Sequence, residues 1–310
     1  MRFSSVISLP PQIPMLKDTG KMGDMSEPLK IAIASGKGGT GKTTVSVSLA
    51  HALSARSSVT LIDCDVEEPN AHLLADIEFD RCIVGQVDGV KVDSGKCTGC
   101  GKCAEACRFN AIAVLPSGVM LFEELCHSCM GCVLACQEKC FQETQRRMGE
   151  VRFGHRGGLK LVSGLLDVGQ AMAAGLIEVV CGYDQGAEIV ILDSPPGTNC
   201  AMLAAVGGCD RVILVTEPTP FGLNDLKLAV DSLRHISKPF DVVVNRNVEG
   251  VDIVENYCQS QGIEILTRIP DDLEVAKLYS DGTVPYGNSK CFTDAVDMLV
   301  EKLNLGVVNR

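Results

Sequence analysis

Eight cysteines of this sequence have the spacing of iron–sulfur cluster ligands. They form two runs in which gaps of two, two and three residues separate successive cysteines. The first run is Cys97, Cys100, Cys103 and Cys107, and the second is Cys126, Cys129, Cys132 and Cys136. Three thiolates at two-residue gaps hold one four-iron cluster, while the fourth cysteine of each run serves the other cluster. The doubled pattern therefore predicts two 4Fe-4S clusters.

Exchanging the fourth ligands between the runs assigns four cysteines to each cluster. The first cluster is expected to take Cys97, Cys100, Cys103 and Cys136, and the second Cys107, Cys126, Cys129 and Cys132. The main alternative is zinc, because four-cysteine zinc sites also use cysteines two residues apart, although they do not require the whole run twice. The doubled run resembles that of the bacterial dicluster ferredoxins, but Arg108 and Gln137 stand where those proteins normally have a proline.

A second segment has the residue types that bind nucleotide phosphates. An apolar run, Leu29–Ser35, predicts a strand, and residues 44–55 are compatible with a helix. The loop between them has the pattern Gly-x-x-x-x-Gly-Lys-Thr, whose glycines let backbone N–H groups surround phosphate oxygens. Lys42 is expected to reach the β and γ phosphates, and the Thr43 hydroxyl to ligate Mg²⁺. The residues predicted to bind ATP here are Gly36, Lys37, Gly38, Gly39, Thr40, Gly41, Lys42, Thr43 and Thr44.

The early lysine of this loop, Lys37, gives the sequence a more specific resemblance. Lys-Gly-Gly-Thr-Gly-Lys-Thr resembles the deviant Walker A motif of the ATPase group that includes MinD, ParA, Mrp and the nitrogenase iron protein. In that group two subunits enclose two ATP molecules, and the early lysine reaches the neighbour's phosphates. The resemblance implies catalytic roles for Lys37 and Lys42 in an ATP-dependent dimer, formed with a second copy or a paired paralogue. The alternative is that Lys37 is a solvated loop lysine.

Three aspartates follow apolar runs, where open α/β sheets bind ligands. Asp63 and Asp65 follow one run, and Asp193 ends another. The family resemblance implies that Asp65 orients the attacking water as a catalytic residue, that Asp63 lies near the magnesium, and that Asp193 holds it through water. Each aspartate alone could instead cap a helix. Asn245 resembles the asparagine with which the family binds adenine, which adds it to the predicted ATP-binding residues.

The elements that must position these residues alternate between apolar runs and longer helical patterns. The six runs are Leu29–Ser35, Val59–Asp65, Leu159–Ser163, Ile189–Asp193, Val212–Thr216 and Val242–Asn245. Continuously apolar strands that alternate with helices indicate a parallel sheet covered on both faces. The predicted fold is a doubly wound, mostly parallel α/β P-loop NTPase that contains a small inserted α+β dicluster ferredoxin-like domain.

Changes in composition predict the domain boundaries. Residues 1–28 contain several prolines and are expected to form a disordered tail. Residues 29–84 and 151–310 are expected to form the ATPase domain in two parts. Residues 85–150, which are rich in cysteine and glycine, are expected to form the insert.

Cys200 is a further candidate ligand, because it lies seven residues after Asp193. In the nitrogenase-iron-protein branch, a cysteine at this offset binds a cluster shared across the dimer. The resemblance implies that role for Cys200, and the alternative is a buried thiol on a helix, since no second bridging cysteine is identifiable. Cys140 is expected to be a packing residue. The remaining cysteines are expected to be buried small hydrophobic residues: Cys64, Cys82, Cys181, Cys209, Cys258 and Cys291.

Composition limits the possible partners and location. The formal net charge of -11 argues against a nucleic-acid partner, because such affinity comes from clustered Lys and Arg. No run approaches the length of about eighteen apolar residues that a membrane span needs. Residues 292–303 form an acidic amphipathic pattern that favours docking on the core over a membrane surface. Many cysteines in a long chain with an ATP motif and no export signal predict thiolates in a reducing cytoplasm.

Three functions fit these residues. In the favoured one, binding and hydrolysis of Mg-ATP in a dimer drive electron transfer or metallocentre assembly through two 4Fe-4S clusters, with an unidentified redox or apoprotein client. The second is a positioning ATPase like MinD or ParA with a redox-sensing insert. The third is a redox sensor that switches its own ATPase, which the sequence cannot separate from the first. Hydrolysis is expected to be slow and to depend on the dimer or a partner.

Overall fold

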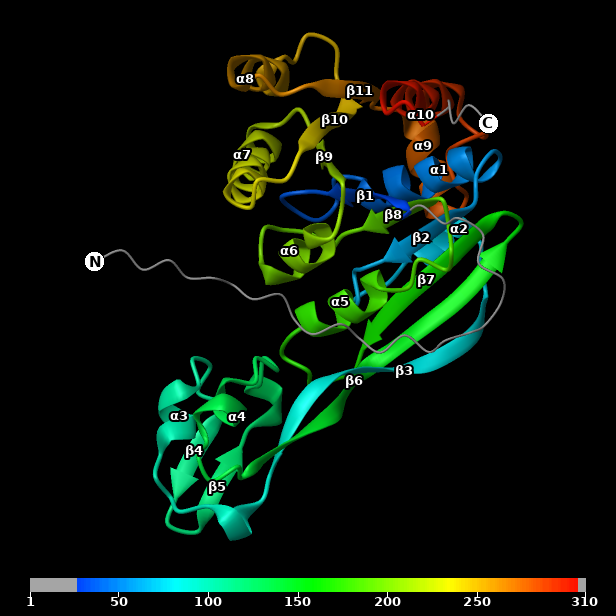
Figure 1. Ribbon diagram of the computed structural model, residues 1–310. Coiled ribbons are helices and arrows are strands. Elements are labelled where there is room, and N and C mark those ends of the chain that lie inside the picture. The colour runs from blue at the N-terminus through cyan, green and yellow to red at the C-terminus, as the bar shows by residue number, and fades with distance from the viewer. Residues whose placement is uncertain (1–26, 306–310) are drawn as a thin grey trace.

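The computed structural model describes residues 27–305, and its main body is a sheet with helices on both faces (Figure 1). Within this range the strands form one nine-stranded sheet and one two-stranded sheet. The predicted tail, residues 1–28, lies outside the described residues except for its last two. The predicted α/β class and mostly parallel sheet are confirmed.

Seven strands of the large sheet are parallel to one another, and the strand order is β11-β10-β9-β1-β8-β2-β7-β6-β3. The parallel strands are β1 Leu29–Ala34, β2 Val59–Asp63, β7 Leu159–Leu166, β8 Ile189–Asp193, β9 Arg211–Thr216, β10 Phe240–Asn247 and β11 Ile265–Pro270. Each of the six predicted apolar runs contributes one of them. Strand β11 was not predicted, because it lies at the sheet edge and its polar Arg268 faces solvent.

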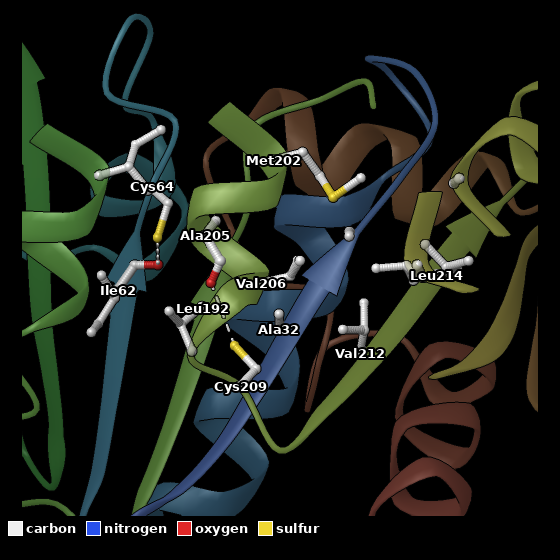
Figure 2. Close-up of a cluster of buried hydrophobic side chains, with 14 of the residues drawn as sticks. Ala32, Ile62, Cys64, Leu192, Met202, Ala205, Val206, Cys209, Val212 and Leu214 are labelled. Carbon is white, nitrogen blue, oxygen red and sulfur yellow. Dashed lines mark hydrogen bonds between the residues drawn. The ribbon is translucent and has the colours of Figure 1, made fainter. Parts of the chain in front are cut away.

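Helices cover both faces, so the sheet is doubly wound. One face is covered by α1 Lys42–Ser54, α2 Ala71–Ala75, α9 Leu273–Ser280 and α10 Lys290–Lys302, and the other by α5 Ala174–Cys181, α6 Cys200–Gly207, α7 Pro220–His235 and α8 Ile253–Gln261. On the second face, Met202, Ala205 and Val206 of α6 lie against Ala32 of β1 and Leu192 of β8 (Figure 2). Burying one large aliphatic side chain stabilises the fold by roughly 1.5–3 kcal/mol, so both layers contribute to the core.

The C-terminal helix α10 docks on the core, as its pattern predicts. Phe292, Val296 and Leu299 are buried against the face covered by α1, while Asp294 and Asp297 are exposed. Within residues 27–305, no helix is both long enough and apolar enough to cross a membrane.

Two long antiparallel strands form an arm that the sequence did not predict. Strands β3, Phe79–Val92, and β6, Phe141–Arg156, pair with each other along their whole length, and the second half of β6 pairs with β7. The domain boundaries expected at residues 84/85 and 150/151 therefore fall inside strands. Pairing continues through both positions because an antiparallel ladder can extend beyond the sheet that anchors it.

The arm carries a small unit, residues 93–140, at its far end (Figure 1). The unit contains the short helices α3 Lys102–Ala106 and α4 Gly131–Ala135, the hairpin β4 Ile112–Leu115 and β5 Gly118–Leu121, and two single 3₁₀ turns, η1 Ser94–Lys96 and η2 Glu123–Leu125. Strand β3 runs parallel to β7, so the arm leaves the sheet at the edge where the parallel strands end. The small unit therefore projects from the same edge as the glycine-rich loop after β1.

The small unit repeats its backbone after 29 residues, since α3 at Lys102 matches α4 at Gly131. Gly99 and Gly101 have φ angles of 72° and 79°, and the matching Ser128 and Met130 also have positive φ angles, of 54° and 56°. A side chain makes this conformation costly, so the second half keeps the backbone of the first despite an unfavourable sequence. The duplication predicted from the cysteine spacing therefore extends to the backbone.

The junction of the arm with the sheet is tightly packed, and this predicts a sensitive position. A Cβ atom on Gly149 of β6 would lie 2.1 Å from the carbonyl oxygen of Leu165 and 2.9 Å from Cδ2 of Leu176. Gly149→Ala should lower the free energy of unfolding in urea by roughly 1–3 kcal/mol, the usual effect of overpacking. Gly207→Ala is the matched control, because a Cβ there meets nothing within 4 Å. If both variants unfolded at the same urea concentration, the packing around Gly149 would have room for a methyl group.

Candidate functional site

The glycine-rich loop between β1 and α1 has a path that few residues other than glycine could follow. Gly39 and Gly41 have φ angles of 82° and 85°. A Cβ atom on Gly36 would lie 2.2 Å from the carbonyl oxygen of Asp225 in α7. A Cβ atom on Gly41 would lie 2.2 Å from Nδ2 of Asn245 in β10. Packing against two neighbouring elements therefore fixes the loop.

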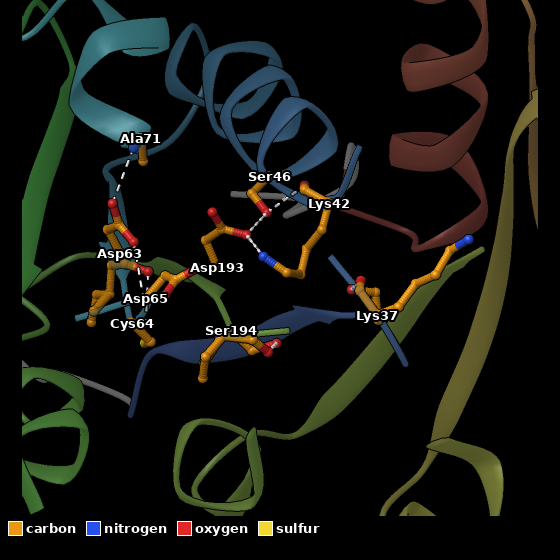
Figure 3. Close-up of polar contacts among 12 residues, drawn as sticks. Lys37, Lys42, Ser46, Asp63, Cys64, Asp65, Ala71, Asp193 and Ser194 are labelled. Carbon is orange, nitrogen blue, oxygen red and sulfur yellow. Dashed lines mark hydrogen bonds and ion pairs between the residues drawn. The ribbon is translucent and has the colours of Figure 1, made fainter. Parts of the chain in front are cut away.

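Lys42, the first residue of α1, turns back toward the end of β8 (Figure 3). Its Nζ lies 3.3 Å from Oδ1 of Asp193, and the Ser46 hydroxyl donates to the same oxygen at 2.9 Å. The side chains of Lys42 and Asp193 are only 8% and 1% exposed. The other oxygen of Asp193 is buried and has no hydrogen-bond partner among the described residues. A buried carboxylate oxygen without a partner is costly, so a cation at this oxygen would be stabilising.

Asp63 lies beside Asp193 because β2 and β8 are parallel neighbours with these residues in register. Asp63 is fully buried, and its two oxygens accept hydrogen bonds from the backbone N–H groups of Asp65 and Ala71 at 3.1 and 3.0 Å (Figure 3). Burial, followed by the negative charge of Asp193, raises the pKa of Asp63 to about 7. Two adjacent carboxylates resist double ionisation unless a cation lies between them.

Asp65 completes a group of three carboxylates at this edge of the sheet. It is half-buried, and burial raises its pKa, while the charge of Lys42 acts in the opposite direction. Carboxylate oxygens are the ligands that Mg²⁺ prefers, so the residues present fit that ion. The structure brings together Lys42, Asp63, Asp65 and Asp193, as predicted from their places after strands.

Lys37 extends in a different direction from Lys42 (Figure 3). Its Nζ lies 3.5 Å from Oε2 of Glu217 at the end of β9, and Arg246 contacts the other oxygen of Glu217 at 2.5 Å. The Lys37 side chain is 34% exposed. Lys37 therefore lies outside the group around Asp193, at a surface that a second molecule could reach.

The remaining predicted nucleotide residues lie around the same loop. Thr43 is half-buried and Thr44 is buried in the first turn of α1. Asn245 is buried, and its Nδ2 donates to the carbonyl oxygen of Thr40 at 2.7 Å. The Thr40 hydroxyl is buried without a partner in the described part of the chain. Asn245 thus supports the loop directly, whatever it contacts in a nucleotide.

Four cysteines of the small unit line one small pocket. They are Cys107, Cys126, Cys129 and Cys132, together with apolar and small residues that include Val90 and Met130. These four are the crossed set predicted for the second cluster. Burial raises the pKa of the Cys132 thiol to about 11, and its neighbours Cys126 and Cys129 add to that shift.

The other crossed set is also assembled in part. Burial raises the pKa of the Cys103 thiol, and the nearby thiols of Cys136 and Cys97 raise it further. The backbone N–H of Cys140 donates to Sγ of Cys136 at 3.3 Å and lowers the pKa of Cys136. The fourth member, Cys100, is exposed. Residues from both runs therefore meet in this set as well.

Backbone N–H groups donate to the sulfur of a predicted cluster ligand at matching places in both halves of the unit. The N–H of Ala111 donates to Sγ of Cys107 at 3.3 Å, four residues along, as Cys140 does to Cys136. Such hydrogen bonds stabilise thiolates and tune the potential of a bound cluster. The donor set therefore fits cluster-bound thiolates.

Among residues 27–305, no three Cys, His, Asp or Glu side chains lie close enough to hold one metal ion.

Comparison with known proteins places the chain in a family. A model of the CobQ/CobB/MinD/ParA nucleotide binding domain matches residues 31–286. The chain belongs to this family. Among its relatives, an uncharacterised protein of Methanocaldococcus jannaschii is 30% identical over 89% of this chain and 96% of its own length. An iron–sulfur cluster carrier protein of Pyrococcus abyssi is 25% identical over 88% of this chain and 86% of its own length.

Solved structures show the same CobQ/CobB/MinD/ParA fold. The septum site-determining protein MinD of Pyrococcus horikoshii, solved with Mg-ADP, superposes with a TM-score of 0.57 and 20% identity, covering 90% of this chain and 96% of MinD. MinD of Pyrococcus furiosus gives a TM-score of 0.57 at 19% identity, covering 91% of this chain and all of that chain. At this identity the likeness concerns the fold alone.

Cys200 and Cys82 differ from the sequence-based expectation. Cys200 is exposed at the start of α6, so the alternative of a buried thiol is wrong. Cys200 is the first residue of α6 and follows the N-cap residue Asn199, whose side-chain oxygen accepts hydrogen bonds from the N–H groups of Ala201 and Met202. Cys82 is exposed on the edge strand β3.

The other cysteines outside the predicted ligand sets mostly follow the expectation. The buried ones are Cys64, Cys140, Cys209 and Cys258, and the half-buried ones are Cys181 and Cys291. Packing of small hydrophobic side chains explains the buried thiols.

Two side chains of the candidate nucleotide site were not predicted from the sequence. Ser46 contacts Asp193, and Glu217 pairs with Lys37. The available signal for Ser46 was its position four residues after Lys42, which places both on one face of α1. Glu217 directly follows a predicted strand, and the expectation that ligand-binding side chains gather where parallel strands end could have found it.

The raised pKa of Asp63 predicts a pH-dependent stability. The folded-state pKa of about 7 exceeds the ordinary 3.8, so the folded state keeps a proton that the unfolded state releases. This contribution is present below pH 3.8 and is lost as the pH rises through 7. Between about pH 5 and 8, the free energy of unfolding should fall by on the order of 2 kcal/mol more in the wild type than in Asp63→Asn.

Urea unfolding in buffers without divalent cations measures this difference. Asn cannot ionise, so any loss from its altered hydrogen bonds is the same at each pH. Parallel pH profiles for the two proteins would contradict the assigned pKa.

Proposed function

We propose that this protein binds and hydrolyses Mg-ATP as a dimer and uses that cycle to control two 4Fe-4S clusters for electron transfer or metallocentre assembly. The observation that supports this most is the placement of the crossed cysteine sets on an arm that leaves the sheet at the nucleotide edge. Membership of the family supports nucleotide binding, and the cysteines of the small unit supply the thiolates.

Each residue of the nucleotide site has a role in this proposal. Lys42 pairs with Asp193 in this structure and binds the β and γ phosphates once the nucleotide is present. Thr43, Asp63 and Asp193 hold Mg²⁺, which when bound supplies positive charge at the phosphates. Asp65, with its pKa raised by burial, orients the attacking water. The glycine-rich loop, together with Asn245 behind it, holds the nucleotide in place.

Lys37 acts on the nucleotide of the partner subunit. Its side chain extends away from Lys42 and is 34% exposed beside Glu217, so a second subunit can reach it. A lysine supplied by the second subunit stabilises negative charge that develops in the transition state. Hydrolysis is then slow until the dimer forms.

The cluster ligands are the two crossed sets. The first cluster is held by Cys97, Cys100, Cys103 and Cys136, and the second by Cys107, Cys126, Cys129 and Cys132. Bound clusters supply one-electron transfer or transferable iron and sulfide. The chain contributes the N–H donors to Cys107 and Cys136 and an apolar pocket that limits water. Exposed Cys200 is the candidate for a ligand shared across the dimer.

The names of the relatives favour iron–sulfur chemistry. Several relatives are called iron–sulfur cluster carrier proteins, at 24–25% identity. A positioning role like that of MinD, with a redox-sensing small unit, is the second candidate, supported by the MinD-like fold. The client that receives electrons or iron and sulfide is a redox protein or an apoprotein.

Variants of the two loop lysines test the nucleotide roles. Lys42→Ala should weaken ATP binding at least tenfold, because charge-assisted hydrogen bonds contribute about 1.5–3 kcal/mol. Lys37→Ala should retain binding but lose ATP-induced dimerisation and hydrolysis by roughly 10²–10³-fold, the usual effect of removing one transition-state donor. Calorimetry, light scattering and phosphate release measure these quantities. Equal loss of binding in both variants would remove the role of Lys37 across the dimer.

Paired cysteine variants test the crossed ligand sets. Anaerobically purified protein should contain about eight irons per chain. Cys97→Ser with Cys136→Ser should leave about four irons, because both residues serve one cluster, whereas Cys97→Ser with Cys107→Ser should damage both clusters. Exposed Cys82→Ser is the control and should retain the full content. Zinc in place of iron, or equal losses in both pairs, would contradict the assignment.

A further inference from the structure

We infer that Arg146 is a positioning residue that couples the nucleotide site to the ligand loop of the second cluster. The inference rests on the proposed function. It adds the contacts that connect the nucleotide site to the small unit, and it names the second cluster as the one that responds. Arg146 lies on β6, in the part of the arm between the large sheet and the small unit.

The route begins at the segment that follows Asp65. The backbone N–H of Leu166, at the end of β7, donates to the carbonyl oxygen of Val66 at 2.8 Å. The next residue, Asp167, donates its N–H to the carbonyl oxygen of Met148 in β6 at 2.9 Å. Displacement of the 65–66 segment is therefore passed by backbone hydrogen bonds to the end of β7 and to the arm.

Two consecutive arginines of β6 hold the loop that follows β7. Arg147 donates from Nε and Nη2 to the two carboxylate oxygens of Asp167 at 2.6 and 3.0 Å. Arg146 donates from Nη1 to Oε1 of Gln170 at 2.9 Å. Planar guanidinium groups with two donors fix orientation as well as distance. The arm and this loop therefore move as one body.

Arg146 also reaches the small unit. Its Nη2 donates to the backbone carbonyl oxygen of Cys126 at 3.2 Å, while its Nε is buried without a partner in the described part of the chain. Cys126 is a ligand in the set proposed for the second cluster. One guanidinium thus joins the loop after β7 to a ligand-bearing loop.

Arg146 donates hydrogen bonds to both of these loops. A cleft of about 410 Å³ lies between them, and its lining includes Glu124, Cys126, Arg146 and Gln170. The space leaves room for one loop to shift relative to the other, so Arg146 determines how much of the shift is transmitted. The matching residue in the first half, Cys97, has no arginine contact to its carbonyl oxygen among residues 27–305. The coupling therefore favours the second cluster.

The coupling requires two arrangements of the 65–66 segment, one for each nucleotide state, which differ at the carbonyl oxygen of Val66. The backbone carbonyl of Cys126 responds through Arg146, and this changes the field and hydrogen bonding at the adjacent cluster ligands. No covalent step is involved. The consequence is a nucleotide-dependent change in the reduced fraction of one cluster.

The test is a redox titration of the loaded protein, monitored by EPR, with and without the non-hydrolysable analogue AMP-PNP. The Cys97→Ser and Cys136→Ser pair identifies the signal of the second cluster. In the wild type, AMP-PNP should change the ratio of reduced to oxidised second cluster at fixed potential by about fivefold, the lower end of common coupling between sites. Arg146→Gln should abolish this change and leave iron content and ATP hydrolysis unaltered.

Two further variants distinguish the loss of the Arg146 hydrogen bonds from the loss of one positive charge on β6. Arg152→Gln is the control, because Arg152 also lies on β6 but pairs with Glu150, and it should respond like the wild type. Gln170→Ala removes the other partner of Arg146 at a half-buried position outside the helices and strands and should reduce the response, even if Arg146→Gln folds poorly.

The outcomes distinguish this inference from the proposed function. Iron and ATP binding in the wild type, with a response that survives in both Arg146→Gln and Gln170→Ala, would overturn the route alone. A loaded wild type that binds AMP-PNP without any change in the second cluster would also overturn it. A wild type without iron or without ATP binding would overturn the proposed function.

Discussion

The fold holds two carboxylates, Asp63 and Asp193, side by side in its interior, and much of the site follows from that constraint. The parallel pairing of β2 with β8 sets them in register, so neither can move away without breaking the sheet. Lys42 and Ser46 meet one oxygen of Asp193, and backbone N–H groups meet both oxygens of Asp63. A phosphate that draws Lys42 away from Asp193, or a cation that binds in its place, therefore changes the charge beside Asp63 at the end of β2.

The parts of the fold that the sequence predicted are those determined by neighbouring residues. The glycine-rich loop and the apolar strands are continuous segments, and a strand that is buried on both faces must be apolar throughout. The arm escaped prediction because β3 and β6 extend beyond the helices, where polar side chains such as Gln145 and Arg147 are exposed. Nothing local distinguishes such strands from a loop, since their pairing joins residues as distant as Phe79 and Gly154.

The contacts of the candidate site also divide into those that the sequence predicted and those that it did not. The aspartates were predictable, because parallel strands bring their carboxyl ends to one edge and each aspartate lies at or just beyond the end of a strand. The contact of Ser46 with Asp193 spans 147 positions, and it depends on how α1 settles on the sheet. The contact of Arg146 with Cys126 depends on the twist and length of the arm. Such contacts belong to packing, which spacing alone does not specify.

The arm also determines how the small unit is joined to the rest of the chain. Val92 and Phe141 are paired partners, so the polypeptide enters and leaves residues 93–140 at adjacent points. A segment whose ends are adjacent can be inserted or deleted as one piece. A short hairpin turn could replace it and close the arm, and the order and direction of every other strand would stay the same. Separate evolutionary origins of the nucleotide-binding sheet and the small unit are therefore compatible with this fold, because the two paired strands of the arm connect them.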